Sequence, residues 1–74
     1  APKFAELNDE VLVGGVWSRT NELNLKTRSI VTMTALISKG IVDSSLQYHL
    51  NEAKKNGVTK KEMAEILTHL AFYA

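Results

Sequence analysis

His49 is the first candidate for chemistry in this sequence, because its titratable side chain stands inside an apolar helical pattern. Leu46, His49, Leu50 and Ala53 fall at i, i+3, i+4 and i+7, which puts the imidazole on the inward face of a predicted helix. An imidazole ring titrates close to neutral pH and is therefore suited to proton transfer. A histidine that only packs in a core gives the same pattern, so both interpretations stay open.

A second group of polar residues lies near the end of the chain. Glu65, His69 and Tyr73 recur at i, i+4 and i+8, with Glu62 beside them, so they share one face of a predicted helix. Such side chains could bind a metal ion or pass on a proton. The HExxH spacing of zinc proteases is absent, and an ordinary solvated face explains the same residues. We expect no metal site here.

Trp17, Arg19 and Arg28 bracket a predicted loop at residues 20–25. Guanidinium groups bind carboxylates through two parallel hydrogen bonds, and an indole beside them would offer a flat apolar wall. The group suits a small carboxylate substrate, although a capped loop with surface arginines would have the same sequence. No glycine-rich phosphate loop, nucleotide fingerprint or nucleophile elbow is present.

Helical patterns account for nearly all of the chain, and the first two helices are predicted at residues 2–19 and 26–39. Pro2 suits a first helical turn, and Leu7, Val11 and Leu12 follow at helical spacing. The pair Gly14 and Gly15 weakens or bends this helix. The second helix has a predicted cap at Asn24 and a stop at Gly40. We expect it to be central and buried on several sides, because apolar residues cover most of its circumference: Ile30, Val31, Met33, Ala35, Leu36 and Ile37.

Two further helices are predicted in the second half of the chain. Asp43 or Ser44 caps the third, which carries His49 and ends at Gly57. Thr59 and Glu62 have the spacing of a capping box at the start of the fourth. One apolar stripe follows on this last helix, made of Met63, Ile66, Leu67 and Leu70. The helical pattern continues to Ala74.

Length and composition predict a single small domain that works in an oligomer. A domain of this size buries only about 60% of its unfolded surface, yet 45% of the residues are hydrophobic, which is more than one small core needs. The net charge is +1, so nothing suggests nucleic acid. The absence of cysteine excludes disulfides and thiol catalysis and fits a cytoplasmic protein. Apolar runs are far shorter than the roughly 20 residues of a membrane span.

Three stretches of the sequence match one known pattern in their order and spacing. They are GGVWSRTNEL, KTRSIVTMTALISKG and LQYHLNEAKKNGVTKKEMAEILTHLAFYA, which together span nearly the whole chain. The most specific parts are VWSR at residues 16–19, the pair Arg28 and Ser29, the HxxxAxxxGVT run at residues 49–59 and the tail at residues 65–74. The chain thus resembles the carboxymuconolactone decarboxylase family, and we expect residues 1–74 to be a single, partial domain of this type.

The resemblance implies an all-α fold, an AhpD-like bundle of about four helices. It also implies a homo-oligomer, a trimer or hexamer, with sites formed near subunit contacts. The family's domain ordinarily continues past the final Tyr-Ala into a turn and a further helix, so we expect this bundle to be truncated at its C-terminal end. No cofactor is implied.

The resemblance further implies a reaction, the loss of carbon dioxide from 4-carboxymuconolactone in aromatic-acid degradation. Electrons from the breaking C–C bond can flow through the conjugated ring into the lactone carbonyl, so the enzyme must stabilise an oxyanion and deliver a proton to carbon. On this chain the resemblance makes His49 the proton donor or oxyanion partner. Arg28 or Arg19 would hold a carboxylate, and Trp17 would shape the pocket.

Two departures from the family pattern bear on the function. Some members have a histidine or glutamate just before the Val-Trp pair, where this chain has Gly15. A non-catalytic or differently active helical oligomer is therefore the alternative to a carboxy-lyase. The AhpD-like branch uses a CxxC pair at the positions of Val42 and Ser45, and without thiols a peroxidase cycle is not expected. The leading hypothesis remains a lyase that acts on a small carboxylated lactone, with no nucleic-acid or membrane partner.

Overall fold

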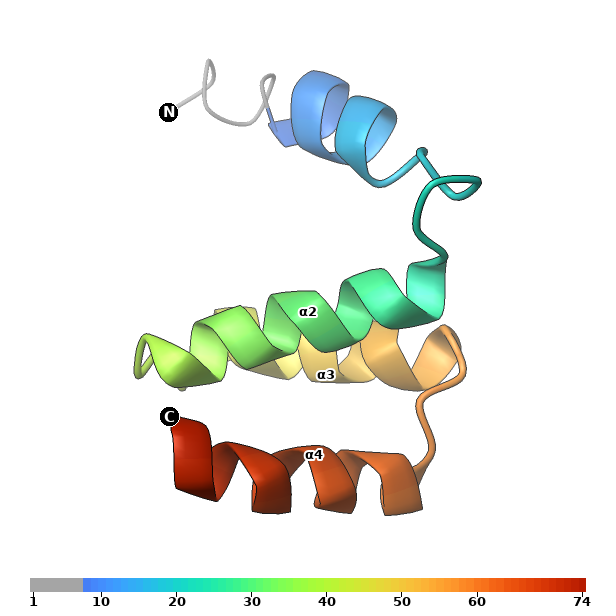
Figure 1. Cartoon of the computed structure of the whole chain (residues 1–74). Coiled ribbons are helices and arrows are strands. Elements are labelled where there is room, and N and C mark those ends of the chain that lie inside the picture. Colours follow the sequence, from blue (N-terminus) through green and yellow to red (C-terminus); the bar gives the residue numbers. More distant parts are fainter. Residues whose placement is uncertain (1–7) are drawn as a thin grey trace.

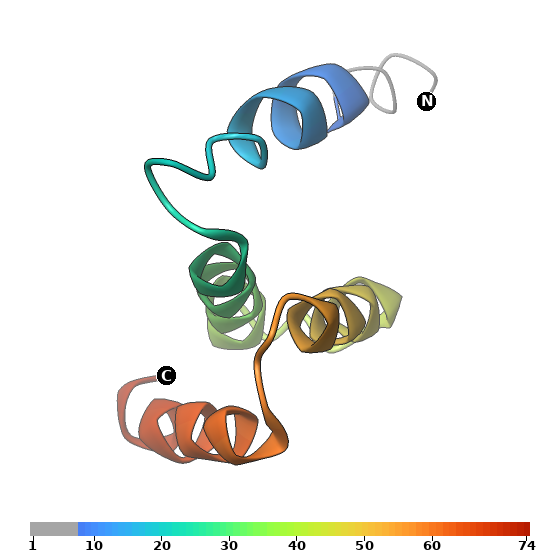
Figure 2. The ribbon, with the colours of Figure 1, turned by 90° about the vertical axis from the view of Figure 1, so that its right-hand side faces the viewer.

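The computed structural model describes residues 8–74, which form four helices and no strand (Figure 1). The helices are η1 (Asn8–Val16), α2 (Leu25–Ser38), α3 (Ser44–Lys55) and α4 (Lys60–Tyr73). Seen end-on, α2, α3 and α4 occupy the corners of a triangle, and η1 stands apart from them on the far side of a connecting loop (Figure 2). The predicted all-α fold is confirmed.

Short polar side chains begin the helices α2 and α3, as their sequences predict. The side-chain oxygen of Asn24 accepts a hydrogen bond from the Thr27 N–H at 2.8 Å. Asp43 accepts one from the Ser45 N–H at 2.9 Å, which decides between the two predicted caps of α3. Each bond satisfies an N–H group that the first helical turn leaves without a backbone partner.

Glycine allows the chain to turn after both of these helices. Gly40 and Gly57 have φ angles of +76° and +100°, in the left-handed region that disfavours side chains with a Cβ. The backbone N–H of Ile41 then bonds back to the Leu36 carbonyl, and that of Val58 to the Ala53 carbonyl, both at 2.9 Å. Both predicted stops are confirmed, and the second of them delivers the chain into α4.

A capping box and an ion pair hold the start of α4. The Thr59 hydroxyl accepts from the Glu62 N–H at 3.1 Å, and the Glu62 carboxylate accepts from the Thr59 N–H at 2.9 Å. The other oxygen of Glu62 lies 2.7 Å from the Nζ atom of Lys26 on α2. The hydrogen bond from Lys26, followed by that from the Thr59 backbone, lowers the pKa of Glu62 from 4.5 to about 2. One side chain thus joins α4 to α2.

The lowered pKa of Glu62 predicts a pH-dependent contribution to stability. The unfolded chain protonates this carboxyl near pH 4.5 and the folded chain only near pH 2, so its contribution is complete above the first value and is lost as the pH falls toward the second. We expect Glu62→Gln to lower the melting temperature at pH 7, and the difference from wild type to shrink between about pH 4.5 and 2. Thermal unfolding followed by circular dichroism across this range measures both quantities.

Glu65→Gln is the matched control, because Glu65 is exposed on the same helix and has no ion pair among the described residues. A difference between Glu62→Gln and wild type that stays constant from pH 7 to pH 2 would contradict the assigned role of the carboxylate.

The core lies where α2 crosses α3 and where the chain enters α4. Met33, Ala53 and Val58 are buried. A ring of partly buried side chains packs against them: Ile30, Leu46, Leu50, Met63 and Ile66. Each α-helix contributes to this cluster, so the predicted inward stripes of α3 and α4 are largely confirmed. Leu67 is the exception, because 47% of its surface is exposed.

The prediction that the helix at residues 26–39 is buried on several sides is wrong for the described chain. In α2 only Ser29 and Met33 are buried, and 55% of Val31 is exposed. The reason is geometric. α3 is the main packing partner of α2, so one edge of the helix faces the core, while Val31 and Ala35 on its other side are exposed.

The first predicted helix also differs from the structure. Pro2 and Leu7 lie outside the described residues, and η1 is a π-helix that ends at Val16 rather than at residue 19. Two adjacent glycines and several valines disfavour a regular α-helix in this segment. The Trp17 N–H continues this pattern by bonding to the Leu12 carbonyl at 2.8 Å. No helix of residues 8–74 is long and apolar enough to span a membrane.

Candidate active site

A cavity of about 420 Å³ lies where η1 and the loop after it face α3. Its walls are mainly apolar, and most of its polar groups come from α3 and its C-cap residue, Asn56. The lining residues are Leu12, Val13, Trp17, Leu25, Tyr48, His49, Glu52 and Asn56. The volume suits a small organic molecule.

His49 lines this cavity between two aromatic rings. The indole of Trp17 lies nearly parallel to the imidazole, with a 13° angle between the planes and 6.4 Å between the ring centres. Tyr48 meets the imidazole edge-on, with the centres 5.1 Å apart. The imidazole makes no hydrogen bond within residues 8–74, so its described contacts are those with the two aromatic rings.

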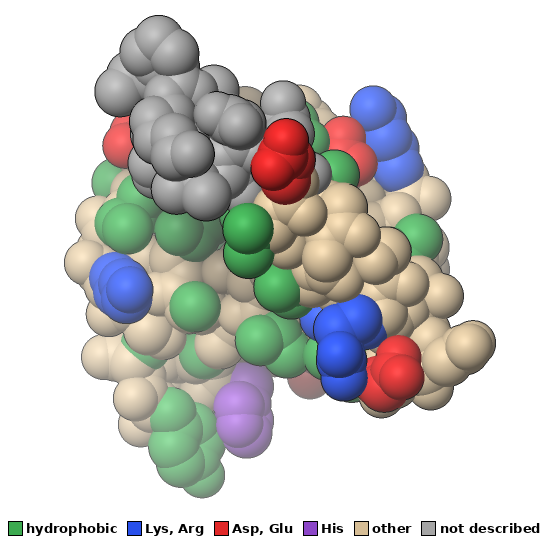
Figure 3. Space-filling view, turned by 90° about the horizontal axis from the view of Figure 1, so that it is seen from above, with side chains coloured by type: hydrophobic (Ala, Val, Ile, Leu, Met, Phe, Trp, Pro, Cys, Tyr) green, Lys and Arg blue, Asp and Glu red, His purple; other side chains and the backbone are tan. Residues whose placement is uncertain are grey.

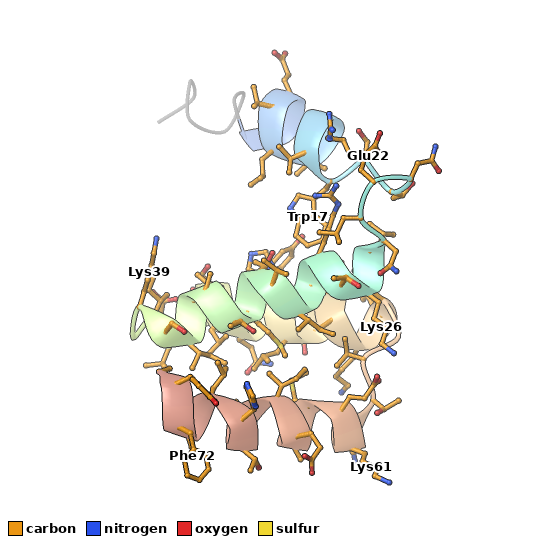
Figure 4. All side chains as sticks on the ribbon, viewed as in Figure 1. Trp17, Glu22, Lys26, Lys39, Lys61 and Phe72 are labelled. Carbon is orange, nitrogen blue, oxygen red and sulfur yellow. The ribbon has the colours of Figure 1, made fainter. Side chains whose placement is uncertain are left out.

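The π-helical end of η1 places Trp17. Figure 4 shows this residue below η1, on the side that faces α2. The hydroxyl of Ser18 caps the helix by donating to the Gly14 and Gly15 carbonyls, at 2.7 and 2.9 Å. The backbone therefore turns directly after the tryptophan, and its indole is directed toward His49, which lies 32 positions later in the chain.

Glu52 and Asn56 are cavity residues that the sequence analysis missed. They follow His49 by three and seven positions, so all three occupy one face of α3. The Asn56 amide donates to the hydroxyl of Ser29 at 2.9 Å, and Ser29 is almost completely buried on α2. Their i+3 and i+7 spacing from His49 could have identified both residues from the sequence.

The structure gives the two arginines different surroundings. Arg28 donates from Nε to the Leu23 carbonyl at 3.0 Å and from Nη2 to the Arg19 carbonyl at 2.8 Å, so it fastens the loop between η1 and α2. It is absent from the cavity lining. The Arg19 guanidinium is exposed and has no hydrogen bond or ion pair within the described chain.

Gly15 leaves a position without a side chain just before the Val16 and Trp17 pair. A Cβ added there would lie 3.7 Å from the Glu10 carbonyl oxygen, which is an ordinary contact distance. A side chain would therefore fit at this position without a clash, so local packing is not the reason that this chain has glycine here.

The second polar group lies away from this cavity. His69 and Tyr73 stack on α4 with 4.7 Å between ring centres. Glu65 and His69 edge a separate hollow of about 390 Å³ between α2 and α4, with Ile30, Ile66 and Leu70 among its apolar residues. Across residues 8–74 no cluster of three potential metal ligands occurs.

The fold and the cavity define a class of protein, a small helical protein with one histidine presented to an apolar pocket. The sequence model of the Carboxymuconolactone decarboxylase family matches residues 2–74. The chain belongs to this family, and the resemblance seen in its motifs is confirmed.

A curated relative from Acinetobacter baylyi, named 4-carboxymuconolactone decarboxylase, is 44% identical over 61 residues. The matched region covers 82% of this chain and 44% of the relative, so the chain spans about half of that protein's length. No solved structure gives a significant match to the chain.

Proposed function

We propose that this protein is a cofactor-free carboxy-lyase that decarboxylates 4-carboxymuconolactone or a close analogue in the cytoplasm. The observation that supports it most is the position of His49, the one histidine in a ligand-sized apolar cavity of a chain from this family. The similarity to a protein named 4-carboxymuconolactone decarboxylase supports the choice of substrate class.

The reaction needs an electron sink and a proton donor. The bond between the ring and the leaving carboxylate breaks, and its electron pair moves through the conjugated ring to the lactone carbonyl, which becomes an enolate oxygen. Carbon dioxide departs, and protonation at carbon then completes the product. Polar groups placed at the oxyanion and a positioned acid are sufficient for these steps.

The cavity residues suit these tasks. His49 has no hydrogen-bond partner within residues 8–74, so in its protonated form it is free to give a proton to the substrate carbon. Trp17 and Tyr48 form walls for a flat ring. Neither arginine lines the cavity. The Arg19 guanidinium is exposed, whereas two N–H groups of Arg28 are bonded to the loop, so the binding of a substrate carboxylate by Arg19 stays a prediction. A direct catalytic role of Arg28 stays a prediction.

A turnover assay tests this proposal. The intact protein is incubated with 4-carboxymuconolactone, and the loss of substrate and the release of carbon dioxide are followed together. We expect enzyme-dependent release in equal amounts. Ligand binding without any release would contradict the lyase and favour the alternative, a non-catalytic or differently active family member, which the absence of a side chain at Gly15 supports.

We further propose that the protein works as a homo-oligomer. The chain exposes 5525 Å², whereas a compact monomer of 8.2 kDa exposes about 4,500 Å². Large apolar side chains contribute to the excess, and hydrophobic atoms lie between a few separated charges on the face seen in Figure 3. Phe72 is 83% exposed and points away from α2 and α3 in Figure 4. Burial of such residues favours association.

We expect sedimentation of the intact protein to give a trimer or hexamer. Phe72→Lys should shift the distribution to smaller species, because a charge would be buried at an apolar contact. Lys61→Glu on the same helix is a control for a surface charge change. A wild-type protein that sediments as a stable monomer at micromolar concentration would contradict the oligomer.

A further inference from the structure

The charge inside the cavity is unusual for a site that receives acids. Among the described residues its polar groups are His49, Glu52, Asn56, the Tyr48 hydroxyl and the indole N–H of Trp17, and no lysine or arginine of residues 8–74 lines it. Arg28 is bonded to two loop carbonyls. Within residues 8–74, the carboxylate of Glu52 is therefore the one permanent charge at the cavity wall.

The negative charge of Glu52 is only partly compensated. Its nearest cation is the Nζ atom of Lys55, 3.4 Å away, and the Lys55 side chain is 74% exposed while that of Glu52 is 33% exposed. An exposed pair at this distance is weak and screened by salt. A ligand inside the cavity would lie against this carboxylate, which repels a second carboxylate nearby.

Asn56 adds a fixed hydrogen-bond acceptor beside this carboxylate. One N–H of its amide is bonded to the buried hydroxyl of Ser29, which restricts rotation of the amide. The amide oxygen has no partner within the described chain. Glu52 and Asn56 stand four positions apart on the cavity face of α3, so together they form an end of the cavity that accepts hydrogen bonds.

We propose that Glu52 is a specificity-determining residue, which makes the cavity select lactones with a single carboxylate and a hydroxyl or N–H donor at the Glu52 and Asn56 end. A lactone with two carboxylates, such as 4-carboxymuconolactone, is then a poorer ligand than an analogue in which a donor group replaces the second carboxylate. This inference rests on the proposed function, since it refines the substrate of the same site.

Binding of matched, unreactive ligands separates this inference from catalysis. The probes are γ-butyrolactone γ-carboxylate and the corresponding β,γ-dicarboxylate, both saturated and without the conjugated system that decarboxylation needs. Trp17 is the one tryptophan of the chain and lines the cavity, so its fluorescence reports occupancy directly. We expect wild type to bind the monocarboxylate about tenfold more tightly than the dicarboxylate at low salt.

Two variants test whether the charge of Glu52 causes the preference for the monocarboxylate. Glu52→Gln keeps the shape of the side chain and its hydrogen bonding but removes the charge, and we expect it to bring the two affinities within about twofold of each other. Lys55→Gln removes the cation outside the cavity and leaves Glu52 in place, so the preference should persist or increase. A loss of preference in Lys55→Gln, or an unchanged preference in Glu52→Gln, would overturn the proposal.

Two further outcomes bear on the proposed role of Glu52. Equal binding of both probes to wild type, or no fluorescence response to either, overturns the role of Glu52 whether or not the protein releases carbon dioxide from 4-carboxymuconolactone. A tenfold preference that Glu52→Gln abolishes supports the role even when turnover is absent, and in that case only the proposed lyase activity fails.

Discussion

Replacing His49 with glutamine is expected to lower turnover by about 100-fold while the fold and the oligomer persist. Glutamine has a similar reach and still forms hydrogen bonds, but it cannot act as an acid near neutral pH. Loss of a general acid typically costs 10²- to 10⁴-fold. The ring also packs beside Trp17 and Tyr48, so a small fall in melting temperature is expected from the lost aromatic contacts.

His69→Gln is the matched control, because His69 is the second of only two histidines and lies outside the cavity. Turnover and thermal unfolding are measured on the same preparation of each variant. A structural histidine would show the opposite pattern. If His49→Gln lost stability but kept nearly normal activity per folded molecule, its catalytic assignment would be wrong.

The sequence predicted those features of the fold that depend on a few neighbouring residues. Asn24, the Thr59 and Glu62 pair and Gly57 each satisfy or terminate a helix end within a short stretch of backbone, so their types and spacing were sufficient. The position of His49 on the inward face of α3 followed in the same way from helical periodicity.

Features that depend on packing between distant segments were not predictable by these rules. Trp17 stacks on His49 from the end of a π-helix, and no periodicity at the α-helical repeat indicates that form of η1. Arg28 binds loop carbonyls because the backbone folds back over it, although its sequence pattern fits a carboxylate ligand equally well. The sequence analysis did not single out Glu52, because its place in the cavity wall depends on η1, which forms the opposite wall.

The burial of α2 illustrates a related limit. An apolar pattern around a helix states which residues prefer to leave water, but it does not state which partner covers them. Met33 is covered within the chain, whereas Val31 is 55% exposed although it lies only two positions earlier. The same pattern therefore contains both core residues and candidate contacts for another subunit.

Met33→Asn is expected to destabilise the protein by about 3 kcal/mol or more, since two costs add at a completely buried position. The first is the apolar burial that the thioether chain loses. The second is the loss of hydration of a polar amide that would lie against the apolar side chains of Ala53 and Val58. For a domain of this size, a melting temperature lower by about 10 °C or more follows. Leu50→Asn should cost less, because Leu50 is only partly buried.

Val31→Asn provides the internal comparison, since it introduces the same amide two positions away in α2 at a side chain that is 55% exposed. Met33→Leu keeps nearly the same volume and should cost less than about 1.5 kcal/mol, which gives a folded reference if Met33→Asn does not fold at all. Melting curves are recorded at equal protein concentration, because association would couple to stability. If Val31→Asn lowered the melting temperature as much as Met33→Asn, the assignment of Met33 to the core and of Val31 to the surface would be wrong in the assembled protein. If only Met33→Asn lowers the melting temperature, the core where α2 crosses α3 contributes most to the free energy of unfolding.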